Sequence, residues 1–241
     1  MTDAILIADG VTRRFGGLIA VNSISFELQR GQILGIIGPN GAGKSTLFSL
    51  LSGSLRPTAG HVRLKGKDIT GLSAHTVCRR GLARTYQIPR PFSDLTVHDN
   101  IRVARHYGGR GKATRSVHDI LVFCELASKA DALPDSLTHA DLRRLEFARA
   151  LATGPDVILL DELGAGLSEG EISLFGDLIR QVRDWGLSVV LVEHVLSLVM
   201  TISHRVLVMD TGKKIAEDTP NEVTRDPEVI AAYLGRSRNE A

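Results

Sequence analysis

The chain has 241 residues, 43% of them hydrophobic and 23% charged, which is the balance of a folded globular protein and excludes a disordered or fibrous one. A formal net charge of +2 is too small to drive binding to nucleic acid, so we expect no nucleic-acid partner. The only two cysteines, Cys78 and Cys124, stand outside any CxxC spacing, and the sequence therefore indicates neither a disulfide framework nor a zinc site.

The first part of the chain is rich in predicted strands. Residues 23–28 alternate polar and apolar side chains, as in a strand with one buried face. Residues 32–37 are continuously apolar, as in a strand that is covered on both faces. The predicted elements are strands over 5–7, 23–28, 32–37 and 61–64 and a helix over 44–51.

The middle of the chain, about 88–153, is predominantly helical, and the last part alternates apolar strands with helices. Apolar strands separated by helices predict a mainly parallel α/β sheet. The apolar stretch 188–210 contains charged residues and histidines, so we interpret it as strand, helix and strand and expect no membrane span. The predicted elements are helices over 96–106, 116–127, 141–152 and 169–183 and strands over 157–160, 188–192 and 206–209.

A glycine-rich segment between a predicted strand and a predicted helix has the form GxxxxGK[ST]. Glycines let successive backbone N–H groups point at one phosphate group, and the helix N-terminus adds a partial positive charge. We expect Lys44 to bridge β- and γ-phosphates, Ser45 to ligate Mg²⁺ and Thr46 to donate a further hydrogen bond. The alternative is a mere glycine turn. The predicted nucleotide-binding residues are Gly38, Pro39, Asn40, Gly41, Ala42, Gly43, Lys44, Ser45 and Thr46.

Two acidic residues end the apolar strand over 157–160. A carboxylate in that position can hold Mg²⁺, which suits Asp161, and its neighbour Glu162 can orient or deprotonate an attacking water. The alternative is a solvated acidic pair that only ends a strand. With the glycine-rich segment, the pair favours a protein that binds a nucleotide and Mg²⁺. Kinases, GTPases and ATPases all stay open, although the sequence lacks an NKxD-type guanine-binding motif, which weakens the GTPase interpretation.

The order of these motifs resembles that of ABC transporter ATPase subunits over nearly the whole chain. In that family an aromatic residue stacks on adenine, which the resemblance assigns to Phe15, for which a core phenylalanine is the alternative. Gln87 matches the Q-loop glutamine, which reaches the Mg²⁺ and water region and whose loop contacts the membrane subunits. His194 matches the switch histidine, which contacts the γ-phosphate. The resemblance implies that Glu162, His194 and Gln87 are catalytic and that Ser45, Gln87 and Asp161 hold the metal.

The resemblance implies a P-loop NTPase fold of the ABC ATPase type. Its α/β architecture has a mainly parallel core sheet, an N-terminal antiparallel β subdomain and an inserted helical subdomain. We expect one domain over 1–241, with a nucleotide-binding core from 1–87 and 154–241 and a helical subdomain over 88–153.

Further stretches are similar to one ATPase subunit of branched-chain amino-acid importers: 85–92 followed by 95–97, then 193–200 and the closing 232–235. The resemblance implies a second ATPase subunit, in a heterodimer or a homodimer, together with permease subunits and, indirectly, a periplasmic solute-binding protein. It places the chain at the cytoplasmic face of the inner membrane, where partners hold it.

The family signature LSGGQ is replaced after Leu137 by Thr138, His139, Ala140 and Asp141. In the family, each signature caps the ATP that is held by the other subunit's P-loop. Here both glycines are lost, and Asp141 would bring a negative charge toward a polyanion. The same four residues fit a capping box for the following helix, which is the interpretation that we favour.

Two more departures, Leu163 in place of a proline and Ser168 in place of Asp or Asn, affect the same predicted dimer interface. We expect a partner's P-loop that faces this altered signature to hydrolyse ATP poorly, which gives a heterodimer with one strong site. Two alternatives to an importer ATPase stay open at this point. One is a weakly catalytic ABC subunit that binds ATP as a dimer clamp, and the other is a non-transport ABC ATPase.

Overall fold

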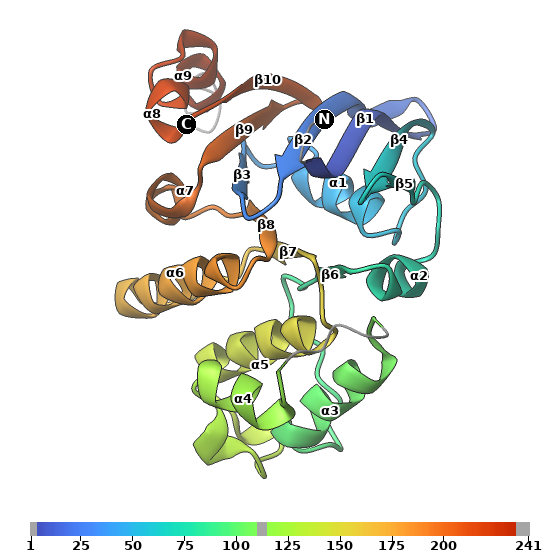
Figure 1. The fold of residues 1–241 in the computed structure, drawn as a ribbon. Coiled ribbons are helices and arrows are strands. Elements are labelled where there is room, and N and C mark those ends of the chain that lie inside the picture. The colour runs from blue at the N-terminus through green and yellow to red at the C-terminus, as the bar shows by residue number, and fades with distance from the viewer. Residues whose placement is uncertain (1–3, 110–114, 235–241) are drawn as a thin grey trace.

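The computed structural model describes residues 4–109 and 115–234. Two sheets lie next to each other, and helices α3, α4 and α5 gather apart from the first sheet on the far side of β6 and β7 (Figure 1). We call α3 to α5 and the turns between them the helical lobe.

The first sheet is antiparallel and has the strand order β2-β1-β4-β5. Its long hairpin turns at Gly16, which adopts a positive φ of 57° that glycine tolerates. The alternation predicted over 23–28 is confirmed, because buried and less buried side chains take turns along β2. The strands are β1 (Ala4–Phe15), β2 (Leu18–Gln29), β4 (Ala59–Leu64) and β5 (Lys67–Asp68).

The second sheet has the order β10-β9-β3-β8-β7-β6, and every pair in it is parallel except β9 with β10. The prediction of a mainly parallel core sheet is confirmed. Three central strands are buried at every residue, as their continuous apolar sequences require. The strands are β3 (Ile33–Ile37), β6 (Leu82–Arg84), β7 (Val157–Asp161), β8 (Ser188–Val192), β9 (Arg205–Asp210) and β10 (Lys213–Asp218).

Two hydrophobic cores lie on the two faces of this sheet. Along β3, Ile33 and Ile37 pack into one core, whereas Leu34 and Ile36 pack into the other. Both faces of the strand are therefore removed from water, which is why its sequence does not alternate. The first core continues into the helical lobe, and the second lies between the two sheets and α1.

The helices of the core follow the predictions where the sequence is strongly periodic. Helix α6 buries Phe175, Ile179 and Val182 and half-buries Ile172, which recur at helical spacing and form its apolar face. The stretch 188–210 forms β8, α7 and β9 as predicted. The core helices are α1 (Lys44–Leu51), α2 (Ala74–Arg79), α6 (Glu169–Asp184), α7 (Leu196–Ile202), α8 (Pro220–Val223) and α9 (Pro227–Leu234).

The helical lobe shows one difference from the sequence prediction. The helix expected over 116–127 ends at Phe123, because Glu125 adopts a left-handed φ of 56° that closes the helix. A separate single turn then follows. The helical elements of the lobe are α3 (Val97–Tyr107), α4 (Val117–Phe123), η1 (Ala127–Lys129), η2 (Pro134–Ser136) and α5 (His139–Ala152).

Among the described residues, no helix combines the length and the apolar character that crossing a membrane would require. Cys78 and Cys124 are both free thiols. Of the stretch 232–235 that was compared with importer subunits, Gly235 lies outside the described residues.

Candidate functional site

The glycine-rich segment joins β3 to α1. Gly41 and Gly43 adopt positive φ values of 79° and 100°, and a side chain on Gly43 would lie 2.3 Å from the carbonyl oxygen of Ala20. A side chain on Gly38 would lie 2.0 Å from the carbonyl oxygen of Met209. Helix α1 has no side-chain cap and no acidic residue in its first turn. Its N-terminal amides therefore remain available to an anion.

Lys44 is buried at the start of α1. Its ammonium group donates hydrogen bonds to the carbonyl oxygens of Gly38 and Pro39, at 2.7 and 3.0 Å. The charge is thus held inside the glycine-rich loop itself, where it would meet the phosphate groups that the loop amides bind.

A cavity of about 280 Å³ lies over this helix end. It is lined by residues 40–46 of the glycine-rich segment together with Glu162 and His194, and the tip of the first hairpin and Gly212 complete its wall. Residues that are more than a hundred positions apart in the sequence therefore meet in one space. Phe15, Gln87 and Asp161 do not line this cavity.

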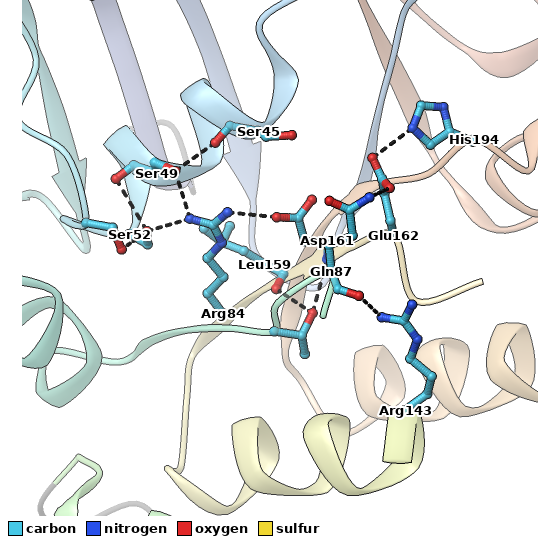
Figure 2. A network of polar contacts seen from close by, with 12 residues as sticks. Ser45, Ser49, Ser52, Arg84, Gln87, Arg143, Leu159, Asp161, Glu162 and His194 are labelled. Carbon is cyan, nitrogen blue, oxygen red and sulfur yellow. Dashed lines mark hydrogen bonds and ion pairs between the residues drawn. The ribbon is translucent and has the colours of Figure 1, made fainter. Parts of the chain in front are cut away.

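Glu162 follows β7 in a left-handed conformation with φ of 50°, which turns its carboxylate toward two other predicted residues. The imidazole Nε2 of His194 lies 2.7 Å from Glu162 Oε1, and the side-chain amide of Gln87 donates to Glu162 Oε2 (Figure 2). Both carboxylate oxygens are thereby oriented. This arrangement suits a general base that must be held in one position beside its substrate.

Asp161 is buried at the end of β7, and its two oxygens have different surroundings. Oδ2 pairs with the guanidinium of Arg84 at 2.7 Å, whereas Oδ1 is buried and has no hydrogen-bond partner among the described residues (Figure 2). Burial raises the pKa of Asp161 above its usual range, although the pairing with Arg84 opposes the rise. A buried carboxylate oxygen without a partner fits a cation or a cation-bound water.

The predicted adenine-stacking residue is on the surface. Phe15 ends β1 with 45% of its area exposed, and the guanidinium of Arg13 lies over its ring at 4.6 Å from the centroid. The ring is outside the core, so the core alternative for Phe15 is wrong. An exposed aromatic ring near the cavity wall presents one face to Arg13 and offers contact area for a flat ring.

The capping box predicted at the start of α5 is confirmed. The amide of Asp141 donates to the hydroxyl of Thr138 at 3.2 Å, and that hydroxyl donates to Asp141 Oδ2 at 2.6 Å. Asp141 is 2% exposed and also accepts from Lys129. Burial alone would raise the pKa of Asp141, but these hydrogen bonds outweigh it and hold that pKa below its usual range.

The expectation that Asp141 turns a negative charge outward is therefore corrected, because its carboxylate points inward and is neutralised by Lys129. Thr138 and His139 are the exposed members of the segment, the ring of His139 lies against Gly166, and Ala140 is buried. Leu163 is buried in the core, and Ser168 caps α6 through a second capping box. Both departures from the family pattern thus have local structural roles.

Sequence reasoning missed Glu193, which lies between β8 and His194 and is 2% exposed. Its carboxylate accepts the amide hydrogen of Gly164 at 2.8 Å. Burial, with the nearby charge of Glu162 as a smaller contribution, raises the pKa of Glu193 to about 7. The only sequence signal was a carboxylate placed directly before a predicted functional histidine at the end of a buried strand.

Arg143 of α5 was also missed. It is buried, and its guanidinium donates to the backbone oxygens of Gln87 and Ala165, the latter at 3.5 Å. Burial lowers the pKa of Arg143, and the charges of Glu193 and Glu162 oppose that effect. Its side chain thus links the helical lobe to the segments that carry Gln87 and Glu162.

The chain is similar to known proteins along nearly its whole length. Residues 21–165 match the ABC transporter family, and residues 213–238 match the family described as branched-chain amino acid ATP-binding cassette transporter. The high-affinity branched-chain amino acid transport ATP-binding protein LivG of Salmonella typhimurium is 36% identical, with 98% of this chain and 100% of that protein aligned. The corresponding protein BraF of Pseudomonas aeruginosa is 37% identical over the same shares.

A solved structure agrees with these relatives. The crystal structure of an ATP-binding cassette of an ABC transporter in its ADP conformation superposes with a TM-score of 0.87 and 29% identity. It covers 97% of this chain and 100% of that one. The two-sheet architecture with a helical lobe is therefore the architecture of that cassette.

Proposed function

The chain belongs to the ABC transporter family of ATP-binding subunits, and from that premise we propose that it hydrolyses ATP to energise an importer of branched-chain amino acids or related solutes. The observation that supports the solute class is the full-length similarity to LivG and BraF, joined by the match of residues 213–238. Because these relatives serve transport, the non-transport alternative is not favoured. The arrangement around the buried Glu162, which His194 and Gln87 orient, argues against a weakly catalytic dimer clamp.

We propose that the nucleotide's phosphates bind the amides of residues 40–46 and the ammonium of Lys44. Phe15 would contact the adenine ring. A Mg²⁺ ion would be held by oxygen atoms of Ser45, Asp161 and Gln87, and when bound it would neutralise charge on the β- and γ-phosphates. The unpartnered Asp161 Oδ1 supports this donor set.

Glu162 would accept a proton from the attacking water, since its carboxylate faces the cavity and is held by His194 and Gln87. His194, at the cavity wall, would also contact the γ-phosphate. In this proposal Glu162, His194 and Gln87 form the catalytic set, and the nucleotide-binding core (1–87 and 154–241) carries all three.

We propose a second ATPase subunit as the partner, most simply in a heterodimer. The α5 end with Thr138, His139, Ala140 and Asp141 would face the partner's ATP. Because the hydroxyl of the exposed Thr138 and the buried carboxylate of Asp141 already bond each other, we expect this end to bind a phosphate less well than a glycine-rich signature would. The partner's P-loop would therefore turn over slowly, whereas this chain's own P-loop would be the strong site.

The loop after β6 would meet the permease subunits. It exposes three large apolar side chains, Tyr86, Ile88 and Phe92, of which Ile88 is 71% exposed. An exposed apolar cluster marks a surface that another protein covers. The chain would thus be peripheral at the cytoplasmic face of the inner membrane, held by the permease, and a periplasmic solute-binding protein would act on it only indirectly.

The test is co-purification of the chain with its permease subunits, followed by ATPase measurement in proteoliposomes with leucine, isoleucine or valine and a binding protein. We expect solute-stimulated hydrolysis that Glu162→Gln abolishes in the same complex. Stimulation by none of these solutes would refute the solute class. Equal turnover of the purified homodimer and the heteromeric complex would refute the asymmetric pair.

A further inference from the structure

Three consecutive residues at the end of β8 contact the segment that carries Glu162. The carbonyl oxygen of Val192 accepts the amide hydrogen of Glu162 at 2.8 Å, and the imidazole of His194 lies 2.7 Å from the Glu162 carboxylate (Figure 2). Between these two, the carboxyl group of Glu193 accepts the amide hydrogen of Gly164 at 2.8 Å. The backbone of Glu162, its side chain and the turn that follows it are thus each bound from one short stretch of chain.

The backbone of Glu162 has a conformation that depends on such support. Its left-handed φ of 50° is uncommon for a residue other than glycine, and a backbone of this kind persists where neighbouring contacts fix it. The chain leaves β7 at this residue and turns over 163–166 before α6 begins. If the turn were not bound, Glu162 would be held from its N-terminal side alone, and its carboxylate would lose its fixed direction at the cavity.

Glu193 is buried at 2% exposure, where a carboxyl group is destabilising unless it is hydrogen-bonded. Burial raises the pKa of Glu193 to about 7, and the backbone hydrogen bond from Gly164 opposes the rise. Two charged groups face it: Glu162 from the end of β7, which raises that pKa further, and Arg143 from α5, whose charge is attracted to both carboxylates. A side chain on Gly164 would lie 3.3 Å from Glu193 Oε2, so the turn packs directly on this carboxyl group.

We propose that Glu193 is a positioning residue for hydrolysis, which binds the amide of Gly164 and thereby keeps Glu162 in its left-handed conformation with the carboxylate directed at the attacking water. Its role is to accept a hydrogen bond, which a carboxyl group does in its charged and in its neutral form. The catalytic consequence rests on the proposed function of Glu162, whereas the attachment of the turn to Glu193 does not.

The attachment is tested on the purified full-length chain by amide hydrogen exchange followed by NMR. Glu193→Met keeps the length and the burial of the side chain but removes its oxygen acceptors, whereas Glu193→Gln keeps one. We expect the amide of Gly164 to exchange about tenfold faster in Glu193→Met and within about twofold of the wild type in Glu193→Gln. Asp156→Leu is the matched control, because Asp156 is a buried carboxylate at the opposite end of β7 and its loss should leave Gly164 unchanged. Wild-type exchange at Gly164 in a folded Glu193→Met protein would overturn the proposal.

The catalytic consequence is tested in the assembled complex at pH 6, where a pKa of about 7 leaves the Glu193 carboxyl group mostly protonated and Gln matches its charge. We expect Glu193→Met to keep the KM for ATP within about twofold and to lower kcat by about tenfold to a hundredfold, because misplacing a catalytic group by about 1 Å has effects of that size. Glu193→Gln should restore kcat to within about threefold of the wild type. A wild-type kcat in Glu193→Met, or an equal loss in both variants, would overturn the proposal. If Glu162→Gln hydrolyses ATP at the wild-type rate, the proposed function fails, and hydrogen exchange still decides whether Glu193 holds the turn.

Discussion

Two helices in this molecule begin in segments that we propose to face phosphate, and their first turns are built in opposite ways. Helix α1 starts with glycines in left-handed conformations, has no side-chain cap and carries Lys44. Helix α5 starts with Thr138 and Asp141 bonded to each other in a capping box. An N-terminus binds an anion through amides that lack internal acceptors. We therefore call α1, which no side chain caps, the open end, and α5, whose Asp141 amide is taken up by the capping box, the closed end.

The carboxylates near the N-termini of α1 and α5 also differ, in how far their surroundings compensate their charge. At the α5 end, Lys129 compensates Asp141, and the pKa of that carboxyl is lowered. Near the α1 end, burial raises the pKa of Asp161 and of Glu193. Buried acidic groups that their surroundings compensate poorly are expected where a cation and a proton transfer belong. The acidic group of a purely structural cap is instead fully paired.

Lys44→Ala is the strongest test of the proposal that the N-terminus of α1, unlike that of α5, binds phosphate. Removing the ammonium group takes away the only charged side chain of the open helix end, and we expect nucleotide affinity and turnover to fall together by about a thousandfold. Equilibrium binding of ATP to the purified chain and ATPase assays of the complex measure the two quantities. An unaltered affinity would show that the α1 end does not hold the phosphates.

Glu162→Gln separates binding from chemistry at the same end. The amide keeps the shape of the side chain but cannot accept a proton, so we expect turnover to fall several hundredfold while ATP affinity stays within about threefold. The measurement is single-turnover hydrolysis with binding determined in parallel. Should hydrolysis continue at the wild-type rate, another group must be the base.

The raised pKa of Glu193 makes the free energy of unfolding depend on pH. With a pKa of about 7 in the folded chain and 4.5 as the ordinary value, the folded state holds a proton between these pH values that the unfolded state has lost. This contribution to stability falls as pH rises from about 4.5 to 7 and is absent above that. We expect Glu193→Gln to exceed the wild type in free energy of unfolding by about 2–3 kcal/mol at pH 8.

Urea denaturation at pH 5 and at pH 8 tests this expectation, since the gap between wild type and Glu193→Gln should open only at the higher pH. A gap of equal size at both pH values would assign the effect to packing rather than to the buried charge. Asp141 acts in the opposite direction, because its lowered pKa makes stability fall only as the pH drops below about 4.

Much of the fold could be read from the sequence where one periodic pattern dominates. The continuous apolar run over 32–37 and the four-residue face of α6 each identify their element, because burial on two faces or on one face leaves a different pattern. The short elements β5, β6 and α2 were missed. They span two to six residues and depend on tertiary contacts rather than on local preference.

The residues of the candidate site likewise fall into those that a local sequence pattern predicts and those that it does not. Residues 38–46, Asp161 and Glu162 could be predicted as site residues because their chemistry needs residue types at fixed spacing after a strand. Glu193, Arg84 and Arg143 could not be found, since each acts on a partner 29 to 77 positions away that only the folded chain brings near. The direction of the Asp141 side chain was likewise decided by Lys129, which no local pattern links to it.

The smallest expected effect comes from a substitution that tests whether Thr138 only caps helix α5. Thr138→Ala removes the hydroxyl of the capping box and should cost about 1 kcal/mol of unfolding free energy. The matched control is Ser116→Ala at α4, where Ser116 and Asp119 form a capping box of the same kind in the same lobe. If Thr138 only caps, both variants lose similar stability in urea titrations and the complex keeps its ATPase rate. A rate that falls for Thr138→Ala but not for Ser116→Ala would mean that the Thr138 hydroxyl leaves its bond to Asp141 in the dimer to meet the partner's nucleotide, and the closed end would then be a site that opens.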